Sequence, residues 1–404
     1  MFGKALIVVR VKWDGKAPRL HVCTLPVDTA CREAYTGGSP QSKEVAVSTS
    51  LRIATFNVEN LFSRAKVLNF ADNTEGDTII VDVGKLQKEL SQASYDKPKI
   101  LKLYKSLKDY ITIAEVRNKL FNRQKTKVVA DGAAGWSGFI SFKRDKFSEP
   151  ARLNTAKVIR EINADIFCLV EVESRPVLKY FVGDRLKKTG SFETYPHLML
   201  IDGNDDRGID VAMMSRLPIQ TIHSHVDDKD GDGLVFSRDC LELQLRHPDG
   251  FDVFMLLNHF KSKGFGAQST SDNKRRRQAE RVAKILEGYD LTQQLVVVAG
   301  DLNDTPDSAP LAALKQVPNL FDVLAQKFQD PKDRWTYHFN KNQQIDYLFV
   351  SRPLRDALQD AGVERRGIFN VKNYTNGAID SFKTVTSESS SASDHGAVWA
   401  DFTL

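Results

Sequence analysis

Acidic, amide and histidine side chains recur at the ends of apolar segments along this chain. In chain order they are Asn57, Glu59, Glu171, His259, Asp301, Asn303, Asp346, Asp394 and His395. Short apolar segments are typical of buried strands, and polar residues that follow several strands gather at one edge of a sheet. We therefore expect these side chains to form one polar site.

The chemistry that suits this set of side chains is phosphodiester hydrolysis. Carboxylate oxygens, with no cysteine among them, select a hard cation such as Mg²⁺ or Mn²⁺. Such an ion offsets the charge of a phosphate, an amide can hold a non-bridging oxygen, and an Asp or His can deprotonate water. Each segment taken alone is more often structural, since Asp-Leu-Asn at 301–303 can be a turn and Ser-Asp-His at 393–395 a helix cap. The hypothesis depends on their joint occurrence.

A separate acidic segment has the spacing of a calcium-binding loop. Asp228, Asp230 and Asp232 form a D-x-D-x-D-G pattern, with Asp239 at the twelfth position. Helices normally flank such a loop, whereas strands are expected on both sides here, and Asp replaces the usual Glu. A plain acidic turn is the favoured interpretation, with a structural Ca²⁺ site as the alternative.

The elements that must position these residues are short strands mixed with helices from residue 51 onward. Strands are expected at 51–58, 165–170, 209–215, 240–245, 251–258, 295–300, 345–350 and 397–402, and helices at 154–163 and 274–288. This mixture predicts an α/β architecture. Residues 64–150 interrupt it as an insertion with an amphipathic helix at about 100–121, and residues 1–50 are expected to be an appendage of hairpin and linker.

Composition and charge fit an ordinary globular protein that binds a polyanion. The 404 residues are 41% hydrophobic, and 57 basic against 52 acidic residues give a net charge of +5. The excess is concentrated: residues 85–127 hold 12 Lys or Arg against 4 Asp or Glu, and residues 261–281 hold 7 against 2. Such segments attract nucleic acid, although the basic run 274–277 could equally be the solvated start of a helix.

The four cysteines do not form a disulfide framework in a chain of this length. Cys168 and Cys240 are expected in the core, while pairing of Cys23 with Cys31 stays open. No apolar segment is long enough for a signal peptide or a membrane span, so the default expectation is a cytoplasmic monomer without a membrane partner, with secretion left open.

Seven segments, in this order, resemble the endonuclease/exonuclease/phosphatase superfamily of DNase I-like and exonuclease III-like enzymes. They read TFNVENLF, ADIFCLVEVES, RGIDVAMMSRLPI, LLNHFKSKG, VVVAGDLNDTP, QIDYLFVS and SASDHGAVWADF. The resemblance covers about residues 51–404 apart from the insertion. It implies a catalytic domain that is a four-layer α/β sandwich, with two packed mixed sheets flanked by helices.

The resemblance also implies which residues hold the metal and the phosphate. Glu171 is the main carboxylate for Mg²⁺ or Mn²⁺, and Glu59 and Asp394 help to hold the ion. Glu59 stands where many members have Asp or Gln. Asn57 and Asn303 are implied to contact the phosphate or to orient the acids.

Acid–base roles follow from the same resemblance. Asp301 matches the residue that activates water. His259 is implied to hydrogen-bond the phosphate and to help protonate the leaving group. His395, steered by Asp346, is implied to act as a base or to stabilise the transition state. The expected substrate-binding side chains are Arg207, Lys261 and Lys263.

A nuclease acting on DNA or RNA is the favoured function, and two alternatives stay open. Phosphatases and phospholipases that act on inositol phosphates or sphingomyelin share the same core, but no aromatic hairpin for membrane contact stands out here. A non-catalytic binding module is disfavoured because every expected catalytic position is filled. The sequence does not distinguish DNA from RNA, or endonucleolytic from exonucleolytic cleavage.

Overall fold

A computed structural model describes residues 48–61, 67, 73–143, 149–190, 194–205, 207–263 and 267–404. The hairpin expected near the N-terminus, and the pair Cys23 and Cys31, lie outside these residues. Cys168 and Cys240 are buried with free thiols, as expected. Within the described part, no helix has the length and apolar character needed to cross a membrane.

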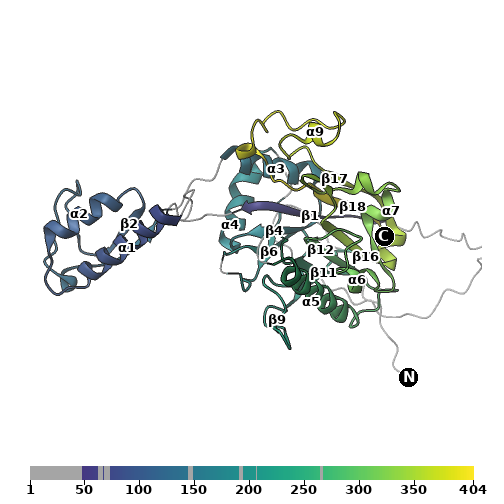
Figure 1. Cartoon of the computed structure of the whole chain (residues 1–404), viewed down its shortest axis with the longest axis horizontal. Helices are drawn as coiled ribbons and strands as arrows, with labels where there is room; N and C mark the ends of the chain where they lie inside the picture. The colour runs from purple at the N-terminus through teal and green to yellow at the C-terminus, as the bar shows by residue number, and fades with distance from the viewer. Residues whose placement is uncertain are drawn as a thin grey trace, which may run out of the picture. The chain divides into compact units, whose positions relative to one another are not determined.

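Two six-stranded mixed sheets form the main body of the described residues (Figure 1). The first sheet has the order β17 (Leu358–Glu364), β18 (Ala397–Thr403), β1 (Ser50–Leu61), β4 (Ile166–Val172), β6 (Asp210–Ser215) and β5 (His197–Leu200). The second has the order β13 (Leu320–Asp322), β16 (Asp346–Ser351), β12 (Leu295–Asp301), β11 (Asp252–His259), β10 (Leu241–Arg246) and β7 (Ile219–Ser224). The pairs β1–β4 and β11–β12 are parallel, so each sheet presents two strand ends side by side at one edge.

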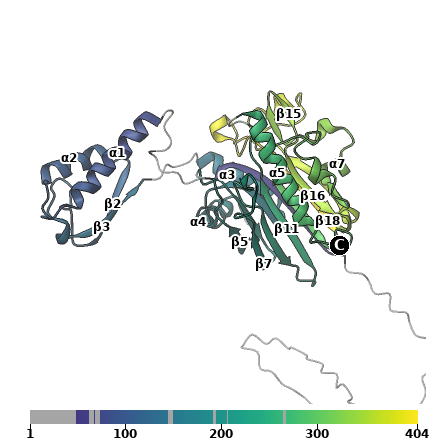
Figure 2. The same ribbon diagram turned by 60° about the horizontal axis from the view of Figure 1, so that its bottom comes forward.

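The two sheets pack face to face, and helices cover their outer faces. The core between the sheets joins Ile53 and Cys168 of the first sheet to Val253 and Val297 of the second. Outside the first sheet lie α3 (Glu149–Ile162), α4 (Arg175–Tyr180) and the π-helix η3 (Phe181–Leu186). Outside the second lie α5 (Gln268–Leu286), which Figure 2 shows running along that sheet, and α6 (Ala312–Lys315). The four-layer α/β sandwich expected from the sequence is confirmed.

All eight expected strands are present, with ends that shift by at most three residues. Both expected helices are also present, although α3 and α5 begin several residues earlier than the sequence pattern suggested. The strands β5, β7, β13 and β17 were not expected from the sequence. All four are edge strands, and the propensity of an edge strand depends strongly on the neighbour against which it packs.

The insertion contains its own elements and its own apolar cluster. The elements are α1 (Asn73–Leu90), α2 (Lys97–Leu107), β2 (Ile111–Arg117), η2 (Ala133–Gly135) and β3 (Ser137–Phe142). The expected helix over 100–121 is wrong beyond residue 107, where the chain becomes a strand. The reason lies in the β-branched residues Ile111, Thr112 and Ile113, which favour a strand and pair antiparallel with β3.

The remaining elements are short. They are β8 (Lys229–Asp230), β9 (Gly233–Leu234), α7 (Val323–Lys327), η4 (Pro331–Arg334), β14 (Tyr337–Phe339), β15 (Lys341–Gln343), α8 (Arg352–Ala357), α9 (Val371–Tyr374) and η5 (Glu388–Ser390). The hairpins β8–β9 and β14–β15 follow from antiparallel pairing of neighbouring segments.

Candidate active site

Three neighbouring strands of the second sheet present His259, Asp301 and Asp346 in one row. His259 at the end of β11 is opposite Asp301 at the end of β12, and Asp301 is opposite Asp346 at the start of β16. All three are buried. Because residues that are directly opposite on neighbouring strands share a face, the sheet itself brings these three side chains together.

Asp301 accepts hydrogen bonds on both carboxylate oxygens. The backbone N–H of Asn303 donates to Oδ1 at 2.8 Å, and the Asn57 and Asn303 amides each donate to Oδ2 at 3.2 Å. Burial and the charge of Asp346 nevertheless raise the pKa of Asp301 to about 7. An acid with a pKa near neutrality can both take and release a proton during a reaction.

Asp346 and His395 form a buried pair. The carboxylate Oδ2 of Asp346 lies 2.8 Å from Nδ1 of His395. Burial alone would lower the pKa of the His395 imidazole, but Asp346 and Asp394 outweigh it and raise that pKa well above its ordinary value. The Ser393 hydroxyl donates to the Asn57 carbonyl at 2.7 Å and accepts from the His395 N–H, which fixes this loop against β1.

Gly300 allows the close approach of β11 and β12 just before Asp301. Its φ is +135°, and a Cβ there would lie 1.8 Å from the carbonyl oxygen of Asn258. No side chain fits at that distance, and the backbone conformation is one that only glycine adopts readily. A glycine is therefore required for the row of His259 and Asp301 to form.

Glu59 and Glu171 lie where β1 and β4, which are parallel neighbours, each depart from regular pairing. Both have left-handed backbone conformations, with φ of 43° and 66°. The register of β1 with β4 shifts beyond Asn57, and that of β4 with β6 shifts around Glu171. Such irregularities redirect a side chain at the end of a strand. Positive φ at two glutamates costs roughly 1–2 kcal/mol each, which is typical of functional sites.

The carboxylates of Glu59, Glu171 and Asp394 are close enough to affect one another. Glu59 stays partly exposed. Loss of water around its carboxylate and the charge of Asp394 nevertheless raise the pKa of Glu59 to about 7. Burial, with a further contribution from Asp394, also raises the pKa of Glu171. Unfavourable ionised carboxylates are what a divalent cation would stabilise. Among the described residues, however, ligand atoms with metal-site spacing are found on Asp301, Asp346 and His395 and not on these three carboxylates.

His259 lies beside Asp301 as a neutral imidazole. Its Nε2 is 3.8 Å from Asp301 Oδ2, and burial together with the Arg238 charge holds the pKa of His259 well below its ordinary value. Within the part of the chain that the structure describes, the buried Nδ1 of His259 and Oδ1 of Asp346 have no hydrogen-bond partner. Buried polar atoms of this kind are rare, and a substrate could supply the missing partners.

Two further residues belong to this site although no sequence motif indicated them. Arg238 is buried, and its Nε lies 3.2 Å from Asp205 Oδ2. Burial lowers the pKa of Arg238, whereas the charges of Glu171 and Asp301 favour its protonated form. The Tyr337 ring lies 4.7 Å from that of His395, and burial and the surrounding acids raise its pKa to about 12. Neither could be found from sequence, because Arg238 precedes a strand outside the motifs and Tyr337 lies in a short hairpin.

The expected substrate-binding side chains are largely held by acids. Arg207 forms paired contacts with Asp205 at 2.8 and 2.9 Å. Lys263 Nζ lies 2.7 Å from Asp304, and Lys261 Nζ donates to the Ser262 carbonyl at 3.2 Å. Burial and the nearby arginines lower the pKa of Lys261.

The basic run 274–277, in the second and third turns of α5, has a structural role. Arg275 is fully buried and its Nε donates to Asp304 at 2.9 Å. Arg276 pairs with Glu280, and Arg277 with Asp230. The sequence left two interpretations of this run open, and the structure shows a third feature: Arg275 and Arg277 are buried and paired with acids, so they are not solvated residues at a helix start.

The acidic segment with calcium-loop spacing is a hairpin. Asp230 lies in β8, which pairs with β9, and both of its carboxylate oxygens accept from Arg277. Asp228 contacts His225 at 3.1 Å, while Asp232 is exposed. No helices flank the segment within the described residues, so its architecture is that of the favoured acidic turn.

Comparison with known protein families shows which family this chain belongs to. The profile described as the Endonuclease/Exonuclease/phosphatase family matches residues 142–395, more than half of the chain. The chain belongs to this family. Membership supports a hydrolase acting on phosphoester bonds and agrees with the resemblance of the motifs. The search of curated proteins found no match.

Several solved structures are similar to this endonuclease/exonuclease/phosphatase chain. Truncated TDP2 from Caenorhabditis elegans is 20% identical with a TM-score of 0.43, over 64% of this chain and 92% of that one. A family protein from Bacteroides thetaiotaomicron is 16% identical with a TM-score of 0.49, over 88% and 98%. D. rerio TDP2 complexed with single strand DNA product is 15% identical with a TM-score of 0.45, over 64% and 93%.

Proposed function

We propose that this chain is a divalent-metal-dependent phosphodiesterase that hydrolyses nucleic acid. One observation supports this most directly: two buried hydrogen-bonded pairs, Asn57 with Asp301 and His395 with Asp346, come from distant parts of the sequence, and strand pairing places Asp301 opposite Asp346. The candidate carboxylate ligands Glu59, Glu171 and Asp394 adjoin that group. In a phosphodiesterase, such a group moves protons beside a metal-bound phosphate.

Each residue of the group has a distinct task in this proposal. Glu59, Glu171 and Asp394 would hold Mg²⁺ or Mn²⁺, which when bound offsets the charge of the phosphate. Asp301, with its pKa of about 7, accepts a proton from water. Asp346 fixes the His395 ring through Nδ1, so that the other ring nitrogen is directed at the reacting group.

Amide and imidazole groups complete the proposed mechanism. Asn57 and Asn303 orient Asp301 through their amide hydrogen bonds. His259, neutral because its pKa is low, can donate a hydrogen bond to a phosphate oxygen without adding charge. Arg238 supplies a fixed positive charge near Glu171 and Asp301. This charge offsets the repulsion between those carboxylates and the negative charge that builds up on the phosphate in the transition state.

A pocket beside the candidate metal ligands favours a substrate with planar groups. It has a volume of about 270 Å³ and adjoins Glu59 and Asp394. Its wall includes His338 and Tyr374, whose rings stack with centroids 3.7 Å apart, and also Phe369. Aromatic surfaces bind unstacked bases with little sequence preference. A nucleobase next to the scissile phosphate would suit this pocket.

An assay panel tests the proposed function. Duplex DNA, single-stranded DNA, RNA, inositol phosphates and sphingomyelin liposomes are each incubated with Mg²⁺, Mn²⁺ or EDTA. We expect cleavage of a polynucleotide that requires the metal. Cleavage of sphingomyelin or an inositol phosphate alone would favour the phospholipase or phosphatase alternative. No turnover of any phosphoester would overturn an enzymatic role.

A further inference from the structure

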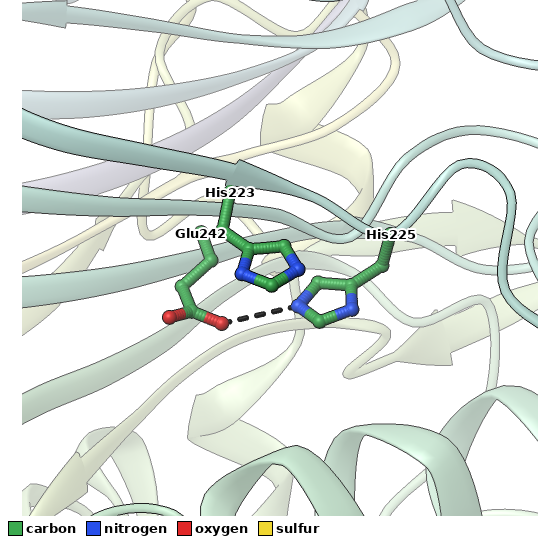
Figure 3. A group of neighbouring side chains, drawn as sticks. All are labelled: His223, His225 and Glu242. Atoms are coloured by element: carbon green, nitrogen blue, oxygen red, sulfur yellow. Dashed lines mark hydrogen bonds and ion pairs between the residues drawn. The ribbon is translucent and has the colours of Figure 1, made fainter.

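A second group of metal-ligating side chains lies at the edge of the second sheet. His223, His225 and Glu242 each offer one ligand atom, and these atoms lie within 4.8 Å of one another. Figure 3 shows the two imidazole rings beside each other, with the Glu242 carboxylate directed toward His225. The rings are stacked, with centroids 4.5 Å apart and planes inclined by 9°. None of these residues belongs to the candidate active site.

The strands place these three side chains together. His223 on the edge strand β7 is directly opposite Glu242 on β10. His225 follows the end of β7, and its N–H donates to Asp239 Oδ1 at 2.7 Å, which fixes the backbone there. In an extended chain, residues two positions apart point to the same side. The two histidines and the glutamate therefore converge above the sheet.

Neighbouring groups orient two of the three ligands as in established metal sites. His225 Nδ1 lies 3.1 Å from Asp228 Oδ2, which leaves Nε2 directed at Glu242. A carboxylate that accepts from the second ring nitrogen is the usual support of a metal-bound histidine. The Tyr289 hydroxyl donates to Glu242 Oε1 at 2.6 Å, which leaves Oε2 for a metal. Arg281 of α5 lies 3.4 Å from Asp228 and holds it in turn.

The spacing of the ligand atoms is also suitable. His225 Nε2 and Glu242 Oε2 are 3.0 Å apart. Two ligands of a tetrahedral ion, each bound at about 2.0–2.1 Å, are separated by roughly 3.3 Å. A small outward movement of the His225 and Glu242 side chains would admit an ion in place of their hydrogen bond. The exposed His223 ring, stacked on His225 with planes inclined by 9°, must also rotate so that a ring nitrogen points at the same position.

We propose that His223, His225 and Glu242 bind a divalent transition-metal ion of the Zn²⁺ class, separate from the candidate catalytic metal. Two imidazole nitrogens and one carboxylate oxygen suit Zn²⁺, whereas Mg²⁺ prefers oxygen ligands alone. His223 is exposed, so the fourth coordination position faces solvent. The ion would join the edge strand β7 to β10 and, through Asp228 and Arg281, to α5.

Zn²⁺ binding to variants of the full chain tests this site. His223→Ala removes one ligand at an exposed position and should leave the fold intact. Thr221→Ala is the matched control, because Thr221 is exposed on the same strand. Thr221 pairs with Gln244 of β10 in the same way that His223 pairs with Glu242, and its hydroxyl contacts the Gln244 side chain. Titrations are made with Mg²⁺ in excess to occupy the oxygen-rich active site. Wild type and Thr221→Ala should bind one more equivalent of Zn²⁺ than His223→Ala.

Two further readouts make the result decisive. Co²⁺ in place of Zn²⁺ should give the visible absorption of a four-coordinate nitrogen and oxygen site in Thr221→Ala and lose it in His223→Ala. Asp228→Asn should weaken Zn²⁺ binding by about 10–100-fold, the usual effect of losing such a support. Equal Zn²⁺ stoichiometry and equal Co²⁺ spectra in His223→Ala and Thr221→Ala would overturn the site. His225 would then be only a clamp between Asp228 and Glu242.

Discussion

Asp346 and His395 are joined by a buried hydrogen bond of 2.8 Å between Oδ2 and Nδ1, although they are 49 positions apart in the sequence. The bond makes Nδ1 the donor and fixes the plane of the imidazole. The other ring nitrogen, Nε2, lies 3.8 Å from Oδ1 of Asp394, a candidate metal ligand. His395 is thus oriented by one carboxylate while it faces another, which is the geometry expected of a proton-transfer group beside a metal site.

Removing His395 or its orienting partner should slow the chemical step. We expect His395→Ala to lower kcat by about 10²–10⁴-fold, the usual contribution of proton transfer. Asp346→Asn should also lower kcat, because an amide no longer stabilises the charged imidazole. Steady-state kinetics on a small diester separate kcat from KM. His247→Ala, a half-buried histidine outside the site, is the control. A raised KM with unchanged kcat would make His395 a binding residue.

Replacing Glu171 should remove the response to metal without harming the fold. Glu171 is half-buried, and loss of water together with the charge of Asp394 raises its pKa, so Glu171→Gln removes an unfavourable charge and should leave Tm in EDTA unchanged or higher. Turnover should be lost, and the rise in Tm that Mg²⁺ produces should shrink. Thermal melts with and without Mg²⁺ and a turnover assay measure both effects. Glu173→Gln, the next glutamate in the chain, is the control. Near-normal Mg²⁺-dependent turnover in Glu171→Gln would refute the ligand assignment.

Stability should depend on pH through Asp301. Burial and Asp346 raise its folded pKa to about 7, while His395, Asn303 and Asn57 favour its ionised form. The pKa of an Asp in the unfolded chain is about 3.9. The stability that Asp301 contributes is therefore present at low pH and is lost as the pH rises through 7.

Between about pH 4 and pH 7 the unfolded chain loses the Asp301 proton while the folded chain keeps it. We therefore expect Tm in EDTA to fall more between pH 5 and pH 8 in wild type than in Asp301→Asn, whose amide cannot ionise. Asp307→Asn, at an exposed acid in the same loop, is the control. Parallel Tm curves for wild type and Asp301→Asn would show that Asp301 keeps an ordinary pKa. Asp301→Ala should also lower kcat by orders of magnitude, if it accepts a proton from water.

Four lysines of α2 and its C-cap should matter only for long substrates. Lys99, Lys102, Lys105 and Lys108 are exposed, and Lys99 pairs with Glu89 at 2.7 Å. If they contact several phosphates, replacing all four with Gln should flatten the salt dependence of nucleic-acid binding, because fewer counterions are released. A small diester such as bis-p-nitrophenyl phosphate should be cleaved as before.

A charge-matched control separates this effect from a general loss of positive charge. It carries Gln at four exposed lysines outside the insertion, namely Lys179, Lys187, Lys188 and Lys327. Binding and cleavage are measured over a range of salt concentrations on long and short substrates. Equal losses on both substrates would mean that α2 supports the fold instead. Equal salt slopes in the two quadruple variants would remove the insertion from substrate binding.

Much of the fold was predictable from the sequence because its strands are short, apolar and bounded by polar residues. The eight expected strands all formed, and the residues Asp301, Asp346 and His395 came together as their motifs suggested. Local pattern was a poorer guide where two periodicities overlapped. Residues 111–117 can continue an amphipathic helix on paper, yet β-branched side chains and pairing with β3 made them a strand.

What only the tertiary structure decided was the partner of each charge. In the sequence, Arg275 is one of four consecutive basic residues, but in the fold it is buried against Asp304, 29 positions away. Glu242 contacts His225 because β10 pairs with β7. Arg238 is buried close enough to Glu171 and Asp301 of the candidate active site to interact with their charges. The sequence by itself determined which chemical groups were available and which strands would carry them. Which groups meet depends on strand register and sheet packing, and no spacing along the chain encodes those contacts.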